Sequence, residues 1–175
     1  MSIPNIYLIG PMGSGKSAVG RRLAKLLDRP FYDSDDEIES HTGVDIGFIF
    51  EKEGEDGFRE RESQMIKELT QLDEIVLATG GGSIVRQENR QWLTSGGTVV
   101  YLATSVPQQL KRTSGRGNRP LLQTDDPAAV LEGLAEIRNP LYESLADITT
   151  VTDNLHVYRV AQAIMEALNK KYEDN

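Results

Sequence analysis

Several residue types and patterns are missing from this chain of 175 residues, and each absence excludes a class of protein. There is no cysteine, which excludes disulfides, thiolate metal sites and a cysteine nucleophile. The two histidines, His41 and His156, are too few and too far apart for a metal site, so we expect both at the surface. No stretch approaches the roughly 20 apolar residues of a membrane span, so no membrane association is expected.

The beginning of the sequence also lacks a targeting pattern. Residues Met1–Asn5 do not form the basic patch followed by an apolar run that is typical of a secretory signal. Together with the absence of cysteine, this favours the cytoplasm.

The chain has little positive charge. It carries 27 acidic and 19 basic residues, a net charge of -8, whereas a nucleic-acid binder must neutralise phosphates and is more often basic. We therefore expect no nucleic-acid partner. One basic island, from residue 111 to residue 120, contains no acid, which favours a local anion there, although a solvated loop is the alternative. Its basic residues are Lys111, Arg112, Arg116 and Arg119.

The length predicts one compact domain, residues 1–175. Short apolar runs alternate with longer amphipathic stretches, which is typical of an α/β fold with a parallel sheet covered by helices on both faces. The predicted strands are Ile6–Ile9, Pro30–Tyr32, Ile75–Ala78, Val99–Leu102 and Ile148–Val151. The predicted helices are Lys16–Leu27, Asp35–Thr42, Asp56–Leu72, Gln87–Thr94, Val106–Arg112, Pro127–Glu143 and Val157–Lys171.

Three smaller expectations follow from the same pattern. Residues Thr113–Asp126 contain glycine and proline without an apolar period and predict a mobile loop. Trp92 lies on an apolar helical face, where we expect it to pack rather than to stack on a base. No exposed hydrophobic stripe stands out, so a monomer is the default expectation.

The most specific motif is a phosphate-binding loop. Residues Gly10–Ser17 match G-x-x-x-x-G-K-[ST] in full, between a predicted strand and a predicted helix. In such a loop, backbone N–H groups converge on phosphate oxygens and the helix N-terminus adds partial positive charge. Lys16 can then reach the β- and γ-phosphates, and the Ser17 hydroxyl can ligate Mg²⁺.

The same loop occurs in GTPases, ATPase motors and kinases. The guanine-selecting N-K-x-D pattern and the D-x-x-G switch are both absent, and a motor usually needs a longer chain. A small-molecule kinase is therefore the favoured class.

Two carboxylates follow the second predicted strand, at the edge where ligands gather in an open parallel sheet. Asp33 and Asp35 could divide their roles, one toward a metal and one toward an acceptor hydroxyl. The alternative is local: Asp35 or Ser34 would cap the helix that follows.

Three further groups are candidates for an acceptor site. Arg59 could bind a ligand, or it could be a surface residue paired with Glu55 or Glu62 at helical spacing. The glycines at 80–82 follow the third strand, where they permit close approach of a ligand or form a flexible turn. Arg138 could bind a ligand or satisfy helix carbonyls.

Together these segments resemble the shikimate kinase family over nearly the whole chain. Six segments in this order carry the resemblance: Gly10–Ser17, Asp-Ser-Asp at 33–35, Gly-Phe-Arg at 57–59, Gly-Gly-Gly at 80–82, Arg-Pro-Leu-Leu at 119–122 and Arg-Asn-Pro-Leu-Tyr at 138–142. The resemblance implies a three-layer P-loop kinase fold with a five-stranded parallel sheet of order 2-3-1-4-5. It also implies a substrate-binding region at about 33–61 and a mobile lid at about 113–126.

The activity implied by the resemblance is transfer of the ATP γ-phosphoryl group to the 3-hydroxyl of shikimate, in the pathway to aromatic amino acids. ATP and shikimate would be the partners and Mg²⁺ the cofactor, with Ser17 and Asp33 on the metal side. There is no Walker-B aspartate after the third strand, where Ala78-Thr79 leads into the glycines, and in the family Asp33 takes over much of that task. The implied catalytic residues are Lys16, Asp35 and Arg119.

The implied binding residues fall into two sets. The nucleotide would be held by Gly13, Ser14, Gly15, Lys16, Ser17, Ala18, Arg112, Arg119 and, at the weakly matched adenine pocket near 154–155, Leu155. Shikimate would be held by Asp35, Arg59, Gly80, Gly81, Gly82 and Arg138.

The chemistry of the residues agrees with this resemblance. Shikimate is a carboxylate with three hydroxyls, so a site for it needs arginines for the carboxylate and an acid for the hydroxyls. The rival enzymes are a gluconate kinase and a nucleoside monophosphate kinase, and the segments at 80–82 and 138–142 argue against both. A nucleotide-binding regulator without activity is the rival of another class, but such a protein is expected to lose Lys16, Asp35 or a substrate arginine, and all are present.

Overall fold

The computed structural model describes residues 2–115 and 119–173. Its five strands are β1 (Asn5–Ile9), β2 (Phe31–Asp33), β3 (Val76–Ala78), β4 (Gly97–Ala103) and β5 (Ile148–Val151). Its helices are α1 (Lys16–Leu27), α2 (Ser34–Thr42), α3 (Ile46–Leu69), α4 (Gln87–Gly96), α5 (Val106–Thr113), α6 (Pro127–Leu145) and α7 (Val157–Glu173), with a short 3₁₀ helix η1 (Pro120–Leu122).

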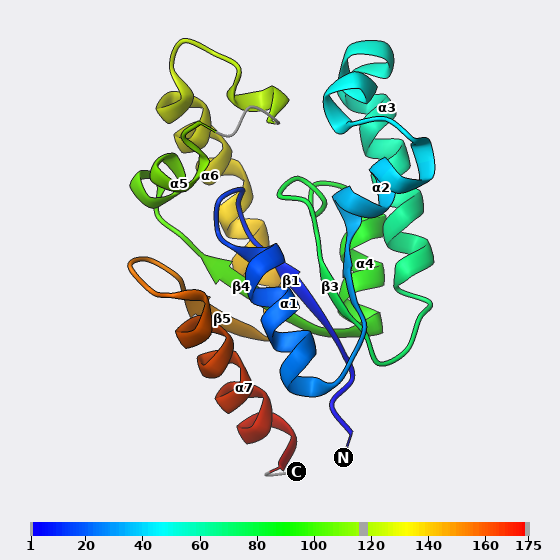
Figure 1. Cartoon of the computed structure of the whole chain (residues 1–175), viewed down its shortest axis with the longest axis vertical. Helices are drawn as coiled ribbons and strands as arrows, with labels where there is room; N and C mark the ends of the chain where they lie inside the picture. The colour runs from blue at the N-terminus through cyan, green and yellow to red at the C-terminus, as the bar shows by residue number, and fades with distance from the viewer. Residues whose placement is uncertain (1, 116–118, 174–175) are drawn as a thin grey trace.

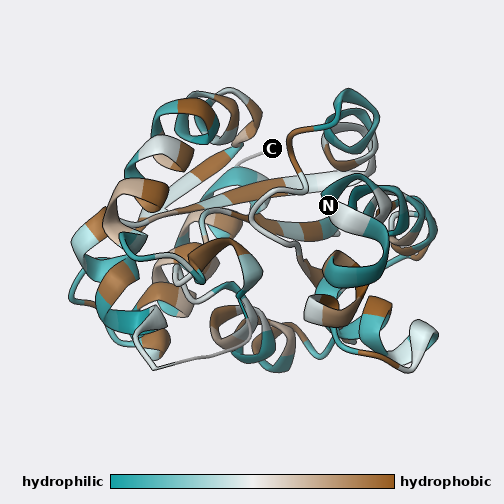
Figure 2. Cartoon of the chain, turned by 90° about the horizontal axis from the view of Figure 1, so that it is seen from above, coloured by the Kyte–Doolittle hydropathy of each residue, from teal (hydrophilic) through white to brown (hydrophobic). Residues whose placement is uncertain are grey.

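All strand pairs are parallel, and the order across the sheet is β2-β3-β1-β4-β5. The predicted three-layer α/β fold and its strand order are therefore confirmed. In β1, Ile6 and Leu8 face a core built with α1 and α7, whereas Tyr7 and Ile9 face a core built with α3, α4 and α6. Successive strand residues point to opposite faces, so this sheet buries both faces. Figure 2 shows apolar colour along the strands and polar colour on the outer faces of the helices.

The loop between β1 and α1 lies between two groups of helices at the carboxyl ends of the strands. Figure 1 shows α5 and α6 on one side of this loop and α2 and α3 on the other. Ligands bind at this edge in open α/β sheets. Among the described residues, no helix is both long enough and apolar enough to cross a membrane.

The largest departure from the predicted helices is at α3, which begins at Ile46 and not at Asp56. Gly54 has a non-helical backbone with φ 72°, so this element is two helices joined at a kink. The first of them was not predicted, because charged residues and Gly54 interrupt its apolar pattern. It forms because Asp45 caps it through Phe48 N at 2.7 Å and because Ile49 packs in the core.

Smaller departures concern the ends of elements. Strand β2 runs through Asp33, one residue beyond its predicted end, and α2 begins one residue early at Ser34. The segment predicted as a loop, Thr113–Asp126, contains η1, and its residues 116–118 lie outside the described part of the chain. Trp92 packs against the core as predicted, and both histidines are exposed.

Candidate active site

The phosphate loop has the backbone that its motif predicts. Gly13 and Gly15 have φ 78° and 90°, which L side chains rarely adopt, so the loop requires glycine at these two positions. The loop wraps around the Lys16 ammonium, which donates to Gly10 O at 2.6 Å and Pro11 O at 2.9 Å. Lys16 is thereby held at the N-terminus of α1, directly under the place where phosphates bind in such loops.

The surroundings of Lys16 disfavour its protonated, charged form. Burial, together with the nearby positive charge of Arg119, lowers the pKa of Lys16 to about 8, while Asp35 and Asp33 act in the opposite direction. An anion brought into the site would relieve this penalty, because an opposite charge favours the protonated amine. The site is thus built to receive negative charge.

Asp33 connects the phosphate loop to the acceptor side. Its Oδ2 accepts a hydrogen bond from the Ser17 hydroxyl, and its Oδ1 accepts from Asp35 N at 3.0 Å and Asp36 N at 3.4 Å. The N-cap of α2 is therefore Asp33, so the alternative in which Ser34 or Asp35 capped this helix is wrong. The Asp35 side chain takes no part in this cap.

A cavity of about 510 Å³ lies over the phosphate loop. Its wall contains the predicted residues of the nucleotide side, namely Gly13, Ser14, Gly15, Lys16, Ser17, Ala18, Asp33, Arg112, Arg119 and Leu155. Thr152 and His156 line it as well, and neither was predicted. The sequence around them matches no motif. Their place in the cavity wall is seen only in the folded chain, where the segment between β5 and α7 lies close to the phosphate loop and α1.

Arg112 contacts the phosphate loop itself. Its guanidinium donates to Gly13 O at 3.1 Å, to Ser14 O at 3.3 Å and to Thr152 O at 2.8 Å. These bonds tie the loop to the end of β5. Arg112 thus supports the loop backbone in addition to lining the cavity.

A second, smaller cavity of about 100 Å³ adjoins the first. It is lined by the predicted acceptor residues Asp35, Arg59, Gly80, Gly81, Gly82 and Arg138, and by apolar side chains of α3 that include Phe50 and Phe58. Asp35 and Arg119 line both cavities, so they stand where the two meet. Of the basic island, Arg112 and Arg119 face the cavities, Lys111 is exposed and Arg116 lies outside the described residues.

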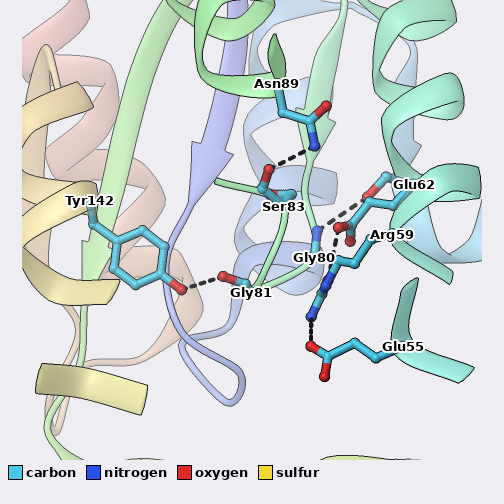
Figure 3. Close-up of polar contacts among 9 residues, drawn as sticks. Glu55, Arg59, Glu62, Gly80, Gly81, Ser83, Asn89 and Tyr142 are labelled. Atoms are coloured by element: carbon cyan, nitrogen blue, oxygen red, sulfur yellow. Dashed lines mark hydrogen bonds and ion pairs between the residues drawn. The ribbon is translucent and has the colours of Figure 1, made fainter. Parts of the chain in front are cut away.

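Arg59 is not a surface residue, contrary to the alternative considered for it. Only 8% of it is exposed, and it bonds Glu62 at 2.8 Å and Glu55 at 3.3 Å, as Figure 3 shows. The spacing therefore identified its partners but not its burial. Its position against Phe58 and the smaller cavity follows from how α3 packs.

The glycines at 80–82 are required by close packing. A side-chain carbon at Gly80 would lie 2.7 Å from Glu62 Oε2, and one at Gly82 would overlap the Arg59 guanidinium. Gly80 N donates to Ser34 Oγ at 3.1 Å, which fixes this turn to α2. The turn is thus packed closely against α2 and α3.

Glu62 is a site residue that the sequence did not single out. It is 1% exposed, and its buried Oε2 has no hydrogen-bond partner among residues 2–115 and 119–173, nor has the buried Asp35 Oδ1. Glu62 lies at helical spacing from the buried Phe58 and Ile66, which is the signal that could have placed it inside.

The Asp35 carboxyl is strongly perturbed. Burial, together with the negative charges of Glu62 and Asp33, raises its pKa from 3.8 to about 7, against the effects of Lys16 and Arg59. A buried acid with an unpaired oxygen at the junction of two cavities is suited to orient a hydroxyl and accept its proton near neutral pH.

We expect Asp35→Asn to stabilise the protein without metal or nucleotide, and to do so more at pH 8 than at pH 5. In the wild type the unfolded chain loses the proton near pH 4 while the folded protein keeps it to about pH 7, so stability falls as pH rises between these values. Asparagine removes this loss, so the stability difference between variant and wild type should grow by roughly 2 kcal/mol from pH 5 to pH 8. Urea unfolding in the presence of a chelator measures it. The same difference at both pH values would contradict the buried acid.

Comparisons with known proteins agree with this geometry. The family model for shikimate kinase matches residues 12–169. A shikimate kinase from Shewanella pealeana is 55% identical over 164 residues, which cover 94% of this chain and 96% of that protein. The solved structure of a shikimate kinase from Acinetobacter baumannii in complex with shikimate has a TM-score of 0.96 at 50% identity, covering 98% of this chain and 96% of that one.

A rival enzyme class is also represented among the solved structures. A gluconokinase from Sinorhizobium meliloti has a TM-score of 0.63 at 17% identity, covering 97% of this chain and 94% of that one. At this identity the likeness shows the shared fold alone.

Proposed function

This chain belongs to the shikimate kinase family, and we propose how its residues transfer the γ-phosphoryl group of ATP to the 3-hydroxyl of shikimate, giving shikimate 3-phosphate and ADP. The observation that carries the assignment of roles is the pair of adjoining cavities, with Asp35 and Arg119 at their junction. ATP occupies the larger cavity and shikimate the smaller one. Phosphoryl transfer depends mainly on positioning and on charge stabilisation, and both need the two substrates to meet in this way.

On the nucleotide side, the loop amides of residues 13–18 and Lys16 bind the phosphates. Arg119 neutralises charge on the moving phosphoryl group, because it faces both cavities. Arg112 holds the loop, and Leu155, which is 45% exposed on the cavity wall, offers an apolar surface to the base.

Ser17 and Asp33 suit Mg²⁺ on the metal side. A hydroxyl and a carboxylate lie in contact at the mouth of the phosphate loop, and hard oxygen ligands of this kind fit the ion. The described residues contain no group of three or more acidic or histidine ligands, which fits an ion held chiefly by waters and phosphates. When bound, Mg²⁺ would neutralise phosphate charge.

On the acceptor side, Arg59 and Arg138 bind the shikimate carboxylate, and the Gly80–Gly82 turn lets the ring approach the backbone. Asp35 orients the 3-hydroxyl and accepts its proton as the oxygen attacks the γ-phosphorus. The substrate-binding region at about 33–61 corresponds to α2 and the first part of α3, whose apolar residues Ile46 and Phe50 line the cavity.

The test of this function is a coupled assay of ADP release with shikimate, gluconate and AMP supplied in parallel. We expect turnover with shikimate and at least about a hundredfold lower kcat/KM with the others, because only shikimate satisfies both the arginines and Asp35. Comparable turnover with gluconate or AMP would reject the assignment.

We further propose that the chain is a single domain, residues 1–175, in which residues 113–126 act as a lid over the two cavities. Arg119 belongs to this segment and faces both cavities, so bound phosphates would draw the segment inward. Limited proteolysis tests it: ADP with shikimate should slow cleavage in this segment, and equal cleavage rates with and without ligands would rule out closure.

We also propose that the enzyme is cytoplasmic, because the sequence contains no cysteine, and that it is a monomer, because no exposed apolar stripe stands out in the sequence. Light scattering of the purified protein tests the monomer, and a mass of twice 19.4 kDa would reject it.

A further inference from the structure

Tyr142 is a buried polar residue to which the roles above assign nothing. It lies on α6, is 1% exposed, and stacks its ring on Tyr101 with 5.1 Å between the ring centroids. This stack belongs to the core on the α6 side of the sheet. The ring is therefore fixed by packing, and only the hydroxyl extends to the site.

The hydroxyl lies between two acceptor-site groups. It donates to Gly81 O at 2.5 Å, as Figure 3 shows. Burial raises the pKa of Tyr142, and the positive charge of Arg138, one helical turn earlier on α6, partly offsets this effect. The hydroxyl consequently keeps its proton and can be donor and acceptor at once.

Gly81 in turn lies against the phosphate loop. A carbon added at Gly81 would be 3.3 Å from Met12 N and 3.7 Å from an Arg138 guanidinium nitrogen. The position of Gly81 thus sets the distance between Arg138 and the phosphate loop. A displacement of Gly81 would therefore affect both Arg138 and the phosphate loop.

We propose that Tyr142 is a positioning residue for the acceptor, whose hydroxyl holds Arg138 and Gly81 in fixed relation so that the guanidinium meets the shikimate carboxylate. This inference rests on the proposed function. Packing alone does not account for a tyrosine here, because phenylalanine would fill the same space in the stack. What phenylalanine lacks is the hydrogen bond to Gly81 O, and Gly81 is the residue that lies beside the Arg138 guanidinium.

The test compares Tyr142→Phe with Tyr101→Phe, which removes a hydroxyl from the other ring of the same stack. For Tyr142→Phe we expect the shikimate Kd, measured calorimetrically without nucleotide, and the shikimate KM to rise about tenfold, the usual result when a buried group loses a hydrogen-bond partner. The KM for ATP should change less than about twofold, because the phosphate-loop contacts are untouched. Tyr101→Phe should match the wild type in all three.

A double-mutant cycle separates positioning from a general loss of stability. If Tyr142 acts through Arg138, then adding Tyr142→Phe to Arg138→Lys should raise the shikimate KM by less than about threefold more. Full multiplication of the two effects, or a normal shikimate Kd in Tyr142→Phe, would overturn the inference and leave the proposed function intact. Failure of the wild-type enzyme to phosphorylate shikimate would overturn both.

Discussion

Asp35→Asn lowers kcat by about a hundredfold or more and leaves ATP binding nearly unchanged, since this is the usual scale of a lost acid–base or orienting group. The carboxyl lies where the two cavities meet, and its Oδ1 is buried with no hydrogen-bond partner among the described residues. Asparagine keeps the shape but cannot accept the proton of the attacking hydroxyl. The groups assigned to ATP are the loop amides of residues 13–18, Lys16, Arg112, Arg119 and Leu155, and Asp35 is not among them.

The matched control is Asp36→Asn, the same substitution one residue later. The Asp36 side chain is 61% exposed and pairs with Arg21 at 3.3 Å on the surface, so near-normal kinetics are expected. Steady-state kinetics and a nucleotide-binding titration on both variants provide the measurement. If Asp35→Asn lost ATP affinity and retained its turnover, the roles assigned to Asp33 and Asp35 would have to be exchanged.

Arg59→Lys and Arg138→Lys each raise the shikimate KM by about 10–100-fold, because each arginine makes charge-assisted hydrogen bonds worth roughly 1.5–3 kcal/mol and lysine lacks the planar fork. The two residues lie on different helices, α3 and α6, yet both are buried and line the smaller cavity. Two buried cations at one small cavity are arranged for an anion. The KM for ATP should barely change.

Arg61→Lys is the control for the first of these variants. It lies two residues from Arg59 on α3 but is exposed and pairs with Glu53 at 2.7 Å, away from the smaller cavity. We expect it to behave as the wild type. A normal shikimate KM in both Arg59→Lys and Arg138→Lys, with only a lower melting temperature, would show that these arginines serve stability and would remove the carboxylate clamp.

The phosphate loop could be predicted from the sequence because its chemistry is local. Eight consecutive residues contain the glycines that allow the backbone to curve and the lysine that the curve surrounds, so no distant contact is needed to define them. The α/β class could be predicted for a similar reason, since strands buried on both faces have to be short and apolar. The strand order was implied by family resemblance, and composition alone would not have supplied it.

The acceptor site depended on contacts between residues far apart in the sequence. Spacing showed that Arg59 could pair with Glu62, but burial of that pair follows from packing α3 against the turn at 80–82, where a side chain at Gly80 would meet Glu62 and one at Gly82 would meet Arg59. Glu62 and Tyr142 were named only as a possible partner of Arg59 and as the end of the segment at 138–142, because their roles depend on burial and on contacts with Gly80 and Gly81 far away in the sequence. The sequence by itself determined which charged groups the protein has and where its phosphate loop begins. Only the tertiary structure decided which of those groups lose contact with water, because burial depends on every element that packs around a residue.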